Sequence, residues 1–243
     1  MTLAFDSAHA DSPYSKLEVR QAVTYAINRP EIVDTFGFGT WEATDQPNAP
    51  EQFGHVDGLI DYPFDPDKAR QLLSDAGYPD GFSTTIITAS MFPQDPLVAI
   101  QSYLANVGIT AKIEVQAPPA WAATRSSGWN NGLFYVPHGA TDYNYCGFID
   151  RYLQPTSLFA NPGMAYPPGW VDKVHAMLES PDPAVYEPMA RDLVTIYVEN
   201  AMELPLWIQS EVYVMDPWIH DMGVGTHGNG FNWNPNKVWI GPH

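Results

Sequence analysis

The chain has 243 residues, with 28 acidic and 11 basic side chains and a formal net charge of −17 at pH 7. Because the lysines and arginines are few and form no cluster, this balance argues against nucleic acid as a partner and against an anionic membrane surface. The single cysteine, Cys146, excludes an intrachain disulfide bond and a metal site built from several thiolates. No apolar run approaches the length of a membrane span. The first residues lack the charged start and the long apolar core of a secretion signal, so we expect the chain as expressed to remain in the cytoplasm.

Two amphipathic helices are predicted in the first third of the chain. Valine and isoleucine recur at steps of four and predict a helix over residues 15–29. Residues 40–64 are rich in turn-forming residues and are interpreted as an irregular connection. A second helix is predicted to begin at Asp65, whose side chain suits an N-cap and which is followed by proline. It is predicted to end at Gly77, where a left-handed turn is easily formed.

The next segment alternates between strand and helix patterns. Residues 82–88 and 109–115 alternate between apolar and polar side chains, which is typical of half-buried strands. Residues 95–106 predict the helix between them, with Val98 and Leu104 on its buried side. The order strand, helix, strand predicts a crossover unit whose two strands are parallel.

The rest of the chain continues this mixture up to about residue 215. After residue 215 glycine, histidine, asparagine and tryptophan dominate, and the periodicity is lost. We therefore predict an α/β fold, with a mixed sheet flanked by helices. The remaining predicted elements are a helix over 117–128 with Trp121 on its buried side, a strand over 131–136, helices over 169–180 and 183–200, and β segments over 204–208 and 212–215.

Three patches of sequence resemble a known family of receptors. Residues 17–29 read LEVRQAVTYAINR, residues 62–82 read YPFDPDKARQLLSDAGYPDGF, and residues 139–144 read GATDYN. They resemble extracellular solute-binding proteins of family 5, which deliver peptides, nickel complexes and related solutes to ABC importers. The resemblance implies the C-terminal lobe of a type II periplasmic-binding-protein fold without its N-terminal lobe. It also implies a periplasmic or extracellular location for the full-length parent, and importer membrane subunits as its partners.

The same resemblance divides the chain into two parts. Residues 1–215 correspond to the solute-binding C-terminal lobe, and residues 216–243 correspond to a return segment that normally completes the missing first lobe. This return segment carries Trp218, Trp233 and Trp239. Burial of an aromatic side chain is worth about 2 kcal/mol or more. We therefore expect these tryptophans to pack on the remaining lobe or on a second copy of the chain, which would make a homodimer.

The candidate ligand-binding residues lie between 129 and 144. The resemblance implies that Asp142 holds the amino terminus of a peptide, since a desolvated ammonium requires a charged partner; alternatively, Asp142 caps its own turn. Aromatic side chains near this carboxylate could form a wall on which peptides or sugars stack, or they could belong to the core. The predicted ligand-binding set is Asp142, Tyr143, Asn144, Tyr135, Phe134 and Trp129.

An enzymatic alternative uses neighbouring residues. A serine or cysteine nucleophile could assemble with a histidine and an acid in a cleft opened by the missing lobe and cleave small esters. The residues of this alternative are His138, Asp142, Ser126, Ser127 and Cys146. The histidines lack the helical spacing of a metal site, and the glycine-rich residues 223–230 lack the ending of a phosphate loop. No metal or cofactor is predicted.

The sequence thus leaves three functions open. The first is non-catalytic capture of a short peptide or similar small solute. The second is ester hydrolysis in the opened cleft, and the third is a structural fragment that associates with itself through residues 216–243.

Overall fold

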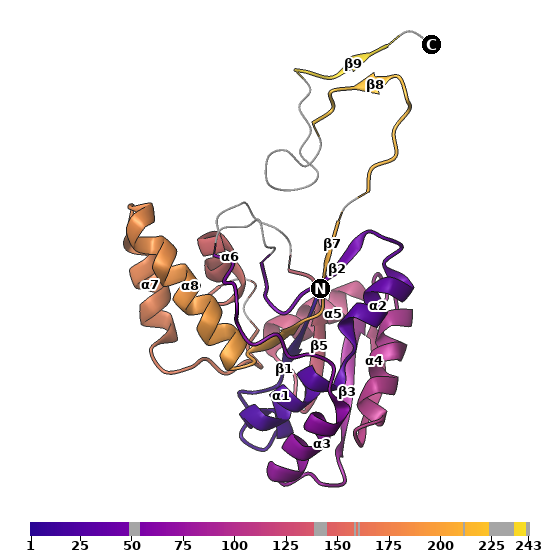
Figure 1. Cartoon of the computed structure of the whole chain (residues 1–243), viewed down its shortest axis with the longest axis vertical. Helices are drawn as coiled ribbons and strands as arrows, with labels where there is room; N and C mark the ends of the chain where they lie inside the picture. The colour runs from indigo at the N-terminus through magenta and orange to yellow at the C-terminus, as the bar shows by residue number, and fades with distance from the viewer. Residues whose placement is uncertain are drawn as a thin grey trace.

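A five-stranded mixed sheet forms the centre of the computed structural model (Figure 1). The structure describes residues 1–48, 54–138, 145–157, 159, 161–210, 212–223 and 236–241. The strand order is β4-β3-β5-β1-β6, in which β3 is parallel to β4 and β5, whereas β1 is antiparallel to β5 and β6. The predicted α/β fold with a mixed sheet is therefore confirmed. The strands are β1 Thr2–Phe5, β3 Phe82–Ala89, β4 Ile109–Gln116, β5 Gly132–Val136 and β6 Glu203–Pro205.

Helices cover both faces of this sheet. Alternate residues of each strand point to opposite faces, and they join two different apolar clusters. Leu3, Leu133 and Tyr135 pack against helices α1 to α4, whereas Ala4 and Phe134 pack beneath helix α5. The helices are α1 Leu17–Ala26, α2 Arg29–Phe36, α3 Pro66–Asp75, α4 Asp95–Ala105 and α5 Pro118–Ser127.

The local signals of the sequence account for the best-predicted elements. Asp65 Oδ1 accepts the backbone N–H of Lys68 at 2.9 Å and caps α3, as predicted. Gly77 and Gly108 have φ of 91° and 90° after α3 and α4, a conformation in which a side chain would be strained. The unit β3-α4-β4 is the predicted parallel crossover, with Phe82 opposite Ile109.

A second apolar core lies beside the sheet and is built from three helices (Figure 1). Helices α7 and α8 pack against each other, and α6 packs against α7. Tyr62, from the connection that follows α2, is buried in this core and donates its hydroxyl to the carbonyl of Val198 at 3.0 Å. We call this part the helical unit; its helices are α6 Tyr145–Tyr152, α7 Trp170–Glu179 and α8 Pro183–Glu199.

Some sequence predictions are wrong in detail. The single helix predicted over residues 15–29 ends at Ala26, and α2 begins at Arg29 with Asn28 as its N-cap. Val98 is 50% exposed although it was expected in the core. Residues 212–215 form no strand, and Val214 is 95% exposed. The strand β1 and the helix α6 are not predicted by periodicity.

The described part of the return segment stands away from the lobe (Figure 1). Strands β8 Ile219–His220 and β9 Trp239–Ile240 pair with each other. Trp239 stacks on His220 with ring centres 4.2 Å apart, donates its Nε1–H to Asp221 and is 50% exposed. Trp239 therefore does not pack on the lobe, which was the first of the two expected arrangements, and its packing on a second copy stays a prediction. Trp233 lies outside the described residues.

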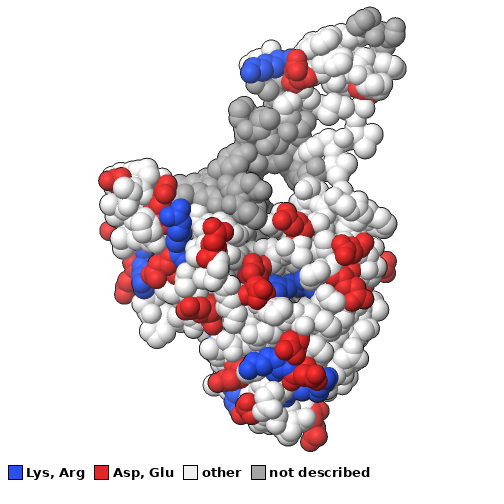
Figure 2. Space-filling view, in the orientation of Figure 1, with Lys and Arg blue, Asp and Glu red and all other residues white. Residues whose placement is uncertain are grey.

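Charge is dispersed on the face that Figure 2 shows. Acidic side chains are scattered over it, and the basic side chains lie in small separate groups with acidic neighbours. In the described part of the chain, no helix is both long and apolar enough to cross a membrane.

Candidate functional site

One edge of the central sheet is the place where the topology favours a ligand. The parallel strands β3, β4 and β5 end there, at Ala89, Gln116 and Val136. Because β1 runs in the opposite direction, its first residue Thr2 lies opposite both Val136 and Pro205. Ligands of sheets with parallel strands bind outside the carboxyl ends of those strands. We call this edge the carboxyl edge.

The predicted ammonium anchor belongs to the segment that leaves this edge. Strand β5 ends at Val136, only two residues before residues 139–144. Asp142, Tyr143 and Asn144 are in that segment and lie outside the described residues. The chain therefore leaves the sheet at the carboxyl edge just before this segment. The anchoring role of Asp142 remains a prediction.

The predicted aromatic wall is wrong for its three described residues, which are buried. Phe134 is completely buried and stacks on Trp121 and Trp129, with ring centres 5.2 and 4.6 Å away. Tyr135 is buried on the opposite face of the sheet, where burial raises the pKa of its hydroxyl. Trp129 is also buried and donates its indole N–H to the carbonyl of Gly132 at 3.1 Å. These side chains fill the core. The prediction failed because the sequence shows which residues are aromatic and not whether they face a ligand.

A buried carboxylate that sequence reasoning missed lies at the beginning of β6, two residues before the carboxyl edge. Glu203 of β6 is 2% exposed. Its Oε2 lies 2.9 Å from Nε2 of His138 and accepts the hydroxyl of Tyr197 at 3.0 Å, and its Oε1 accepts an amide N–H of Asn161 at 2.6 Å. Because a carboxylate can only accept hydrogen bonds, all three partners act as donors to it.

The electrostatics of Glu203 follow from these partners. Burial is the largest influence and raises the pKa of the Glu203 carboxyl, but His138, the Tyr197 hydroxyl and the Arg125 cation together outweigh it. The net pKa is lower than that of an ordinary glutamate. Glu203 is therefore held as a carboxylate that ties the chain after β5 to the helical unit.

The serine arrangement of the enzymatic alternative is not seen among the described residues, and Asp142 of that set lies outside them. His138 uses Nε2 for Glu203, and its Nδ1 has no hydrogen-bond partner in the part of the chain that the structure describes. The hydroxyls of Ser126 and Ser127 donate to backbone carbonyls of their own helix, at 3.1 and 3.5 Å. Cys146 is buried. No serine of this set is hydrogen-bonded to His138, so the described residues show no activated serine.

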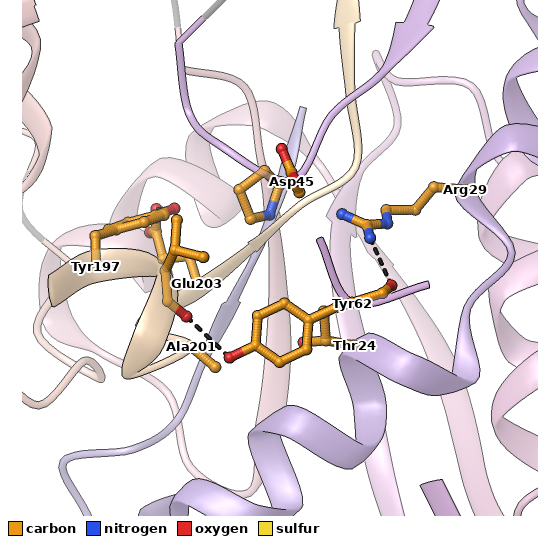
Figure 3. Close-up of a pocket in the computed structure, with 9 residues that line it drawn as sticks. Thr24, Arg29, Asp45, Tyr62, Tyr197, Ala201 and Glu203 are labelled. Carbon is orange, nitrogen blue, oxygen red and sulfur yellow. Dashed lines mark hydrogen bonds between the residues drawn. The ribbon is translucent and has the colours of Figure 1, made fainter. Parts of the chain in front are cut away.

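Arg29 organises the irregular connection that precedes α3 (Figure 3). Its guanidinium donates to the carbonyls of Thr44, Asp61 and Tyr62 at 2.7, 2.7 and 2.8 Å. The recess beside it has a volume of about 10 Å³, which is room for one water molecule. This recess lies where the helices that cover the sheet meet the helical unit, and it is too small for a solute. Its lining consists of Thr24, Arg29, Asp45, Tyr62, Tyr197, Val198, Ala201, Glu203 and Pro205.

Arg20 likewise binds several backbone carbonyls. It donates to the carbonyls of Asn200 and Ala201 just after α8, at 2.8 and 3.0 Å, and to that of Tyr14 at 2.9 Å. Residues 17–29 thus contribute two arginines that hold backbone carbonyls. Among the described residues, no group of three or more histidine, cysteine or acidic side chains could hold a metal ion.

Comparison with known proteins links this architecture to a family. The model of bacterial extracellular solute-binding proteins, family 5 Middle, matches residues 1–157. Heme-binding protein A of Haemophilus influenzae is 39% identical over 82 residues, which are 34% of this chain and 15% of that protein. Glutathione-binding protein GsiB of Escherichia coli strain K12 is 38% identical over 103 residues, which are 42% of this chain and 20% of that protein.

Solved structures match nearly the whole chain. The periplasmic binding protein DppA of Helicobacter pylori, in complex with the peptide STSA, has a TM-score of 0.86 and 25% identity over 98% of this chain and 46% of that one. The dipeptide binding protein of Pseudoalteromonas sp. SM9913, in complex with Met-Leu, has a TM-score of 0.84 and 16% identity over 99% of this chain and 48% of that one. The chain thus spans just under half the length of these structures, and the matched segments cover 15–20% of the two curated relatives.

Proposed function

Because the chain belongs to the bacterial extracellular solute-binding proteins of family 5, we propose that it binds a short peptide or a similar small solute without chemically changing it. The observation that carries this proposal is the carboxyl edge, from which β5 delivers the segment containing Asp142. The similarity to a structure solved with a bound peptide and to a glutathione-binding protein supports a peptide-like solute.

Asp142 is the proposed partner of the solute's ammonium group. An ammonium removed from water requires a charged acceptor, and the resulting hydrogen bond is among the stronger ones in proteins. In two-lobed receptors, closure around the ligand buries it from both sides. A lobe on its own removes less of the solute from water, so we propose a weak affinity for this chain.

In a full-length receptor, the proposed partners are the membrane subunits of an ABC importer. Such a receptor would act in the periplasm or outside the cell, where it would collect its solute. Self-association through residues 216–243 remains a proposal, supported by the exposed apolar side chains of Trp239 and Ile240. Light scattering over a range of protein concentrations would detect it as a rise in mass.

Isothermal titration calorimetry tests the proposed function. The chain is titrated with glutathione and with the tetrapeptide Ser-Thr-Ser-Ala. We expect a saturable heat signal with a dissociation constant in the millimolar to micromolar range. Asp142→Asn should weaken this binding about tenfold or more, because it removes a charge-assisted hydrogen bond. Asp34→Asn, an equivalent change at an exposed position of α2, should leave it unchanged.

The same calorimeter distinguishes the enzymatic alternative. A short-chain ester is added to the chain after the peptide titration, and steady heat would indicate turnover. Steady heat without peptide binding would refute the proposed function. Saturable peptide binding with no turnover would support it.

A further inference from the structure

We propose that strand β4 is a contact through which two copies of the chain associate, in an antiparallel pairing centred on Ile113. Strand β4 is one edge of the five-stranded sheet, and within the described residues it pairs with β3 alone. It is 8 residues long, and an open edge of this kind is a template for pairing with another chain. This contact is separate from the solute site and from the self-association proposed for residues 216–243.

The backbone groups of alternate β4 residues point away from the sheet. The carbonyl of Gln116 accepts the backbone N–H of Ser90 at 2.9 Å, on the side of β3. Because backbone groups alternate in direction along a strand, the odd-numbered residues from 109 to 115 present theirs at the outer edge. The carbonyl of Ala111 agrees with this, since it accepts the side-chain amide of Gln101 from α4 at 2.6 Å. A carbonyl oxygen has two lone pairs, so Ala111 can still accept from a second strand.

Two oppositely charged side chains flank Ile113 along the strand. Ile113 packs against the core beneath helices α1 to α4. Its neighbours Lys112 and Glu114 therefore point to the other face of the sheet, where both are exposed. Neither side chain belongs to an ion pair in the described part of the chain, and Glu114 accepts an amide N–H of Gln116 at 2.8 Å.

The spacing of these charges favours one register. When Ile113 lies opposite Ile113 of a second copy, each Lys112 lies opposite Glu114 of the other copy. A shift by one residue in either direction places Lys112 opposite Lys112, or Glu114 opposite Glu114. Unlike charges directly opposite each other stabilise a sheet, and like charges destabilise it. A lysine on an edge strand ordinarily opposes pairing, and here the glutamate two residues later makes the same lysine favourable in a single register.

An apolar patch follows the same edge on the face that α4 covers. The side chains of Val98 and Val115 are each half exposed. Helix α4 packs on β4 and runs antiparallel to it, as the helix of a parallel crossover does. Val98 lies one turn before Gln101 on the same side of α4, and this places it beside the second half of β4. The proposed pairing brings the patch against its own copy, which removes apolar surface from water.

Sedimentation velocity tests the contact. The chain has a net charge of −17, so it is studied at about 0.15 M salt, where long-range repulsion between copies is screened. Because a single pair of edge strands makes a small interface, we expect a reversible dimer with a dissociation constant in the micromolar range. Lys112→Glu and Glu114→Lys should each weaken it about tenfold or more, because two attractive pairs per dimer become repulsive. Lys68→Glu, an equal change of charge at an exposed position of α3, is the matched control and should leave it unchanged.

Charge exchange gives a second measurement that a loss of folding could not imitate. The double variant Lys112→Glu/Glu114→Lys should dimerise like the unmodified chain. A mixture of the two single variants should form a heterodimer, because the acidic pair of one copy then lies opposite the basic pair of the other. Circular dichroism and urea unfolding show whether each variant keeps the fold, which we expect because both positions are exposed.

Three outcomes would overturn the inference. One is a chain that stays monomeric over the whole range of protein concentrations. Another is a dimer that neither single variant weakens, because the contact would then lie elsewhere, for example in residues 216–243. The third is a pair of monomeric single variants that do not associate when mixed. None of these results bears on solute binding, so the proposed function would stand or fall separately.

Discussion

Replacement of Glu203 by glutamine should destabilise the lobe by about 2–4 kcal/mol at pH 7. The carboxylate accepts from three donors with two oxygens. Glutamine offers one oxygen and places an amide N–H group against at least one of these donors, leaving it unsatisfied at a cost of about 1–3 kcal/mol. The remaining hydrogen bonds lose the strength that the charge gave them, by roughly 1 kcal/mol in total. The two contributions give the expected loss.

The pH dependence gives the sign of the effect. Because the pKa of Glu203 is lowered in the folded chain, its stabilising contribution is fully present above the unfolded pKa of about 4.5. This contribution is lost as the pH falls through the lower pKa of the folded state. Urea unfolding at pH 7 and at pH 3.5 should therefore show a smaller acid-induced loss of stability for Glu203→Gln than for the unmodified chain.

Glu199→Gln is the matched control, because Glu199 is an exposed glutamate at the end of α8. Its unfolding free energy should stay within about 0.5 kcal/mol of the unmodified value. An equal acid-induced loss of stability in the unmodified chain and in Glu203→Gln would refute the reasoning, because another group would then be responsible for it.

Three further changes test separate parts of the fold. Arg29→Met should cost about 3–5 kcal/mol in urea unfolding, because three backbone carbonyls lose a buried charged donor; a loss below 1 kcal/mol would contradict its role in holding these carbonyls. Asp65→Ala should cost about 1 kcal/mol through loss of the α3 cap, whereas Asp67→Ala, in the same turn but without that contact, should cost less. Trp239→Ala should leave the unfolding midpoint of the lobe unchanged, because its ring stacks within the β8–β9 pair, and a large shift would show that it packs on the lobe.

Local sequence signals allowed much of the fold to be predicted. Because such signals act only between residues close in sequence, they also explain what was missed. The cap at Asp65 and the glycines after α3 and α4 act within a few residues of their own positions, so the sequence pattern contains them. Strand β1 is short and buried on both faces, so it shows no alternation and escapes a period-two search.

The candidate site could be predicted only in outline. His138 and Glu203 are 65 residues apart in sequence, and no local pattern links a histidine to a glutamate across three strands. Phe134 and Tyr135 are recognisable in the sequence as neighbouring aromatic residues, but their burial depends on helices that pack on opposite faces of the sheet.

The position of β1 has a consequence for the order in which the chain folds. Thr2 pairs with Val136 on one side and with Pro205 on the other. The first strand therefore lies between β5 and β6, two strands that come much later in the sequence. Strands β3, β4 and β5 can assemble from neighbouring segments, whereas the gap between β5 and β6 closes only when the beginning of the chain is captured there. Loop closure over such distances is slow compared with the formation of local contacts. Capture of β1 should therefore be the late step that locks the helical unit onto the sheet.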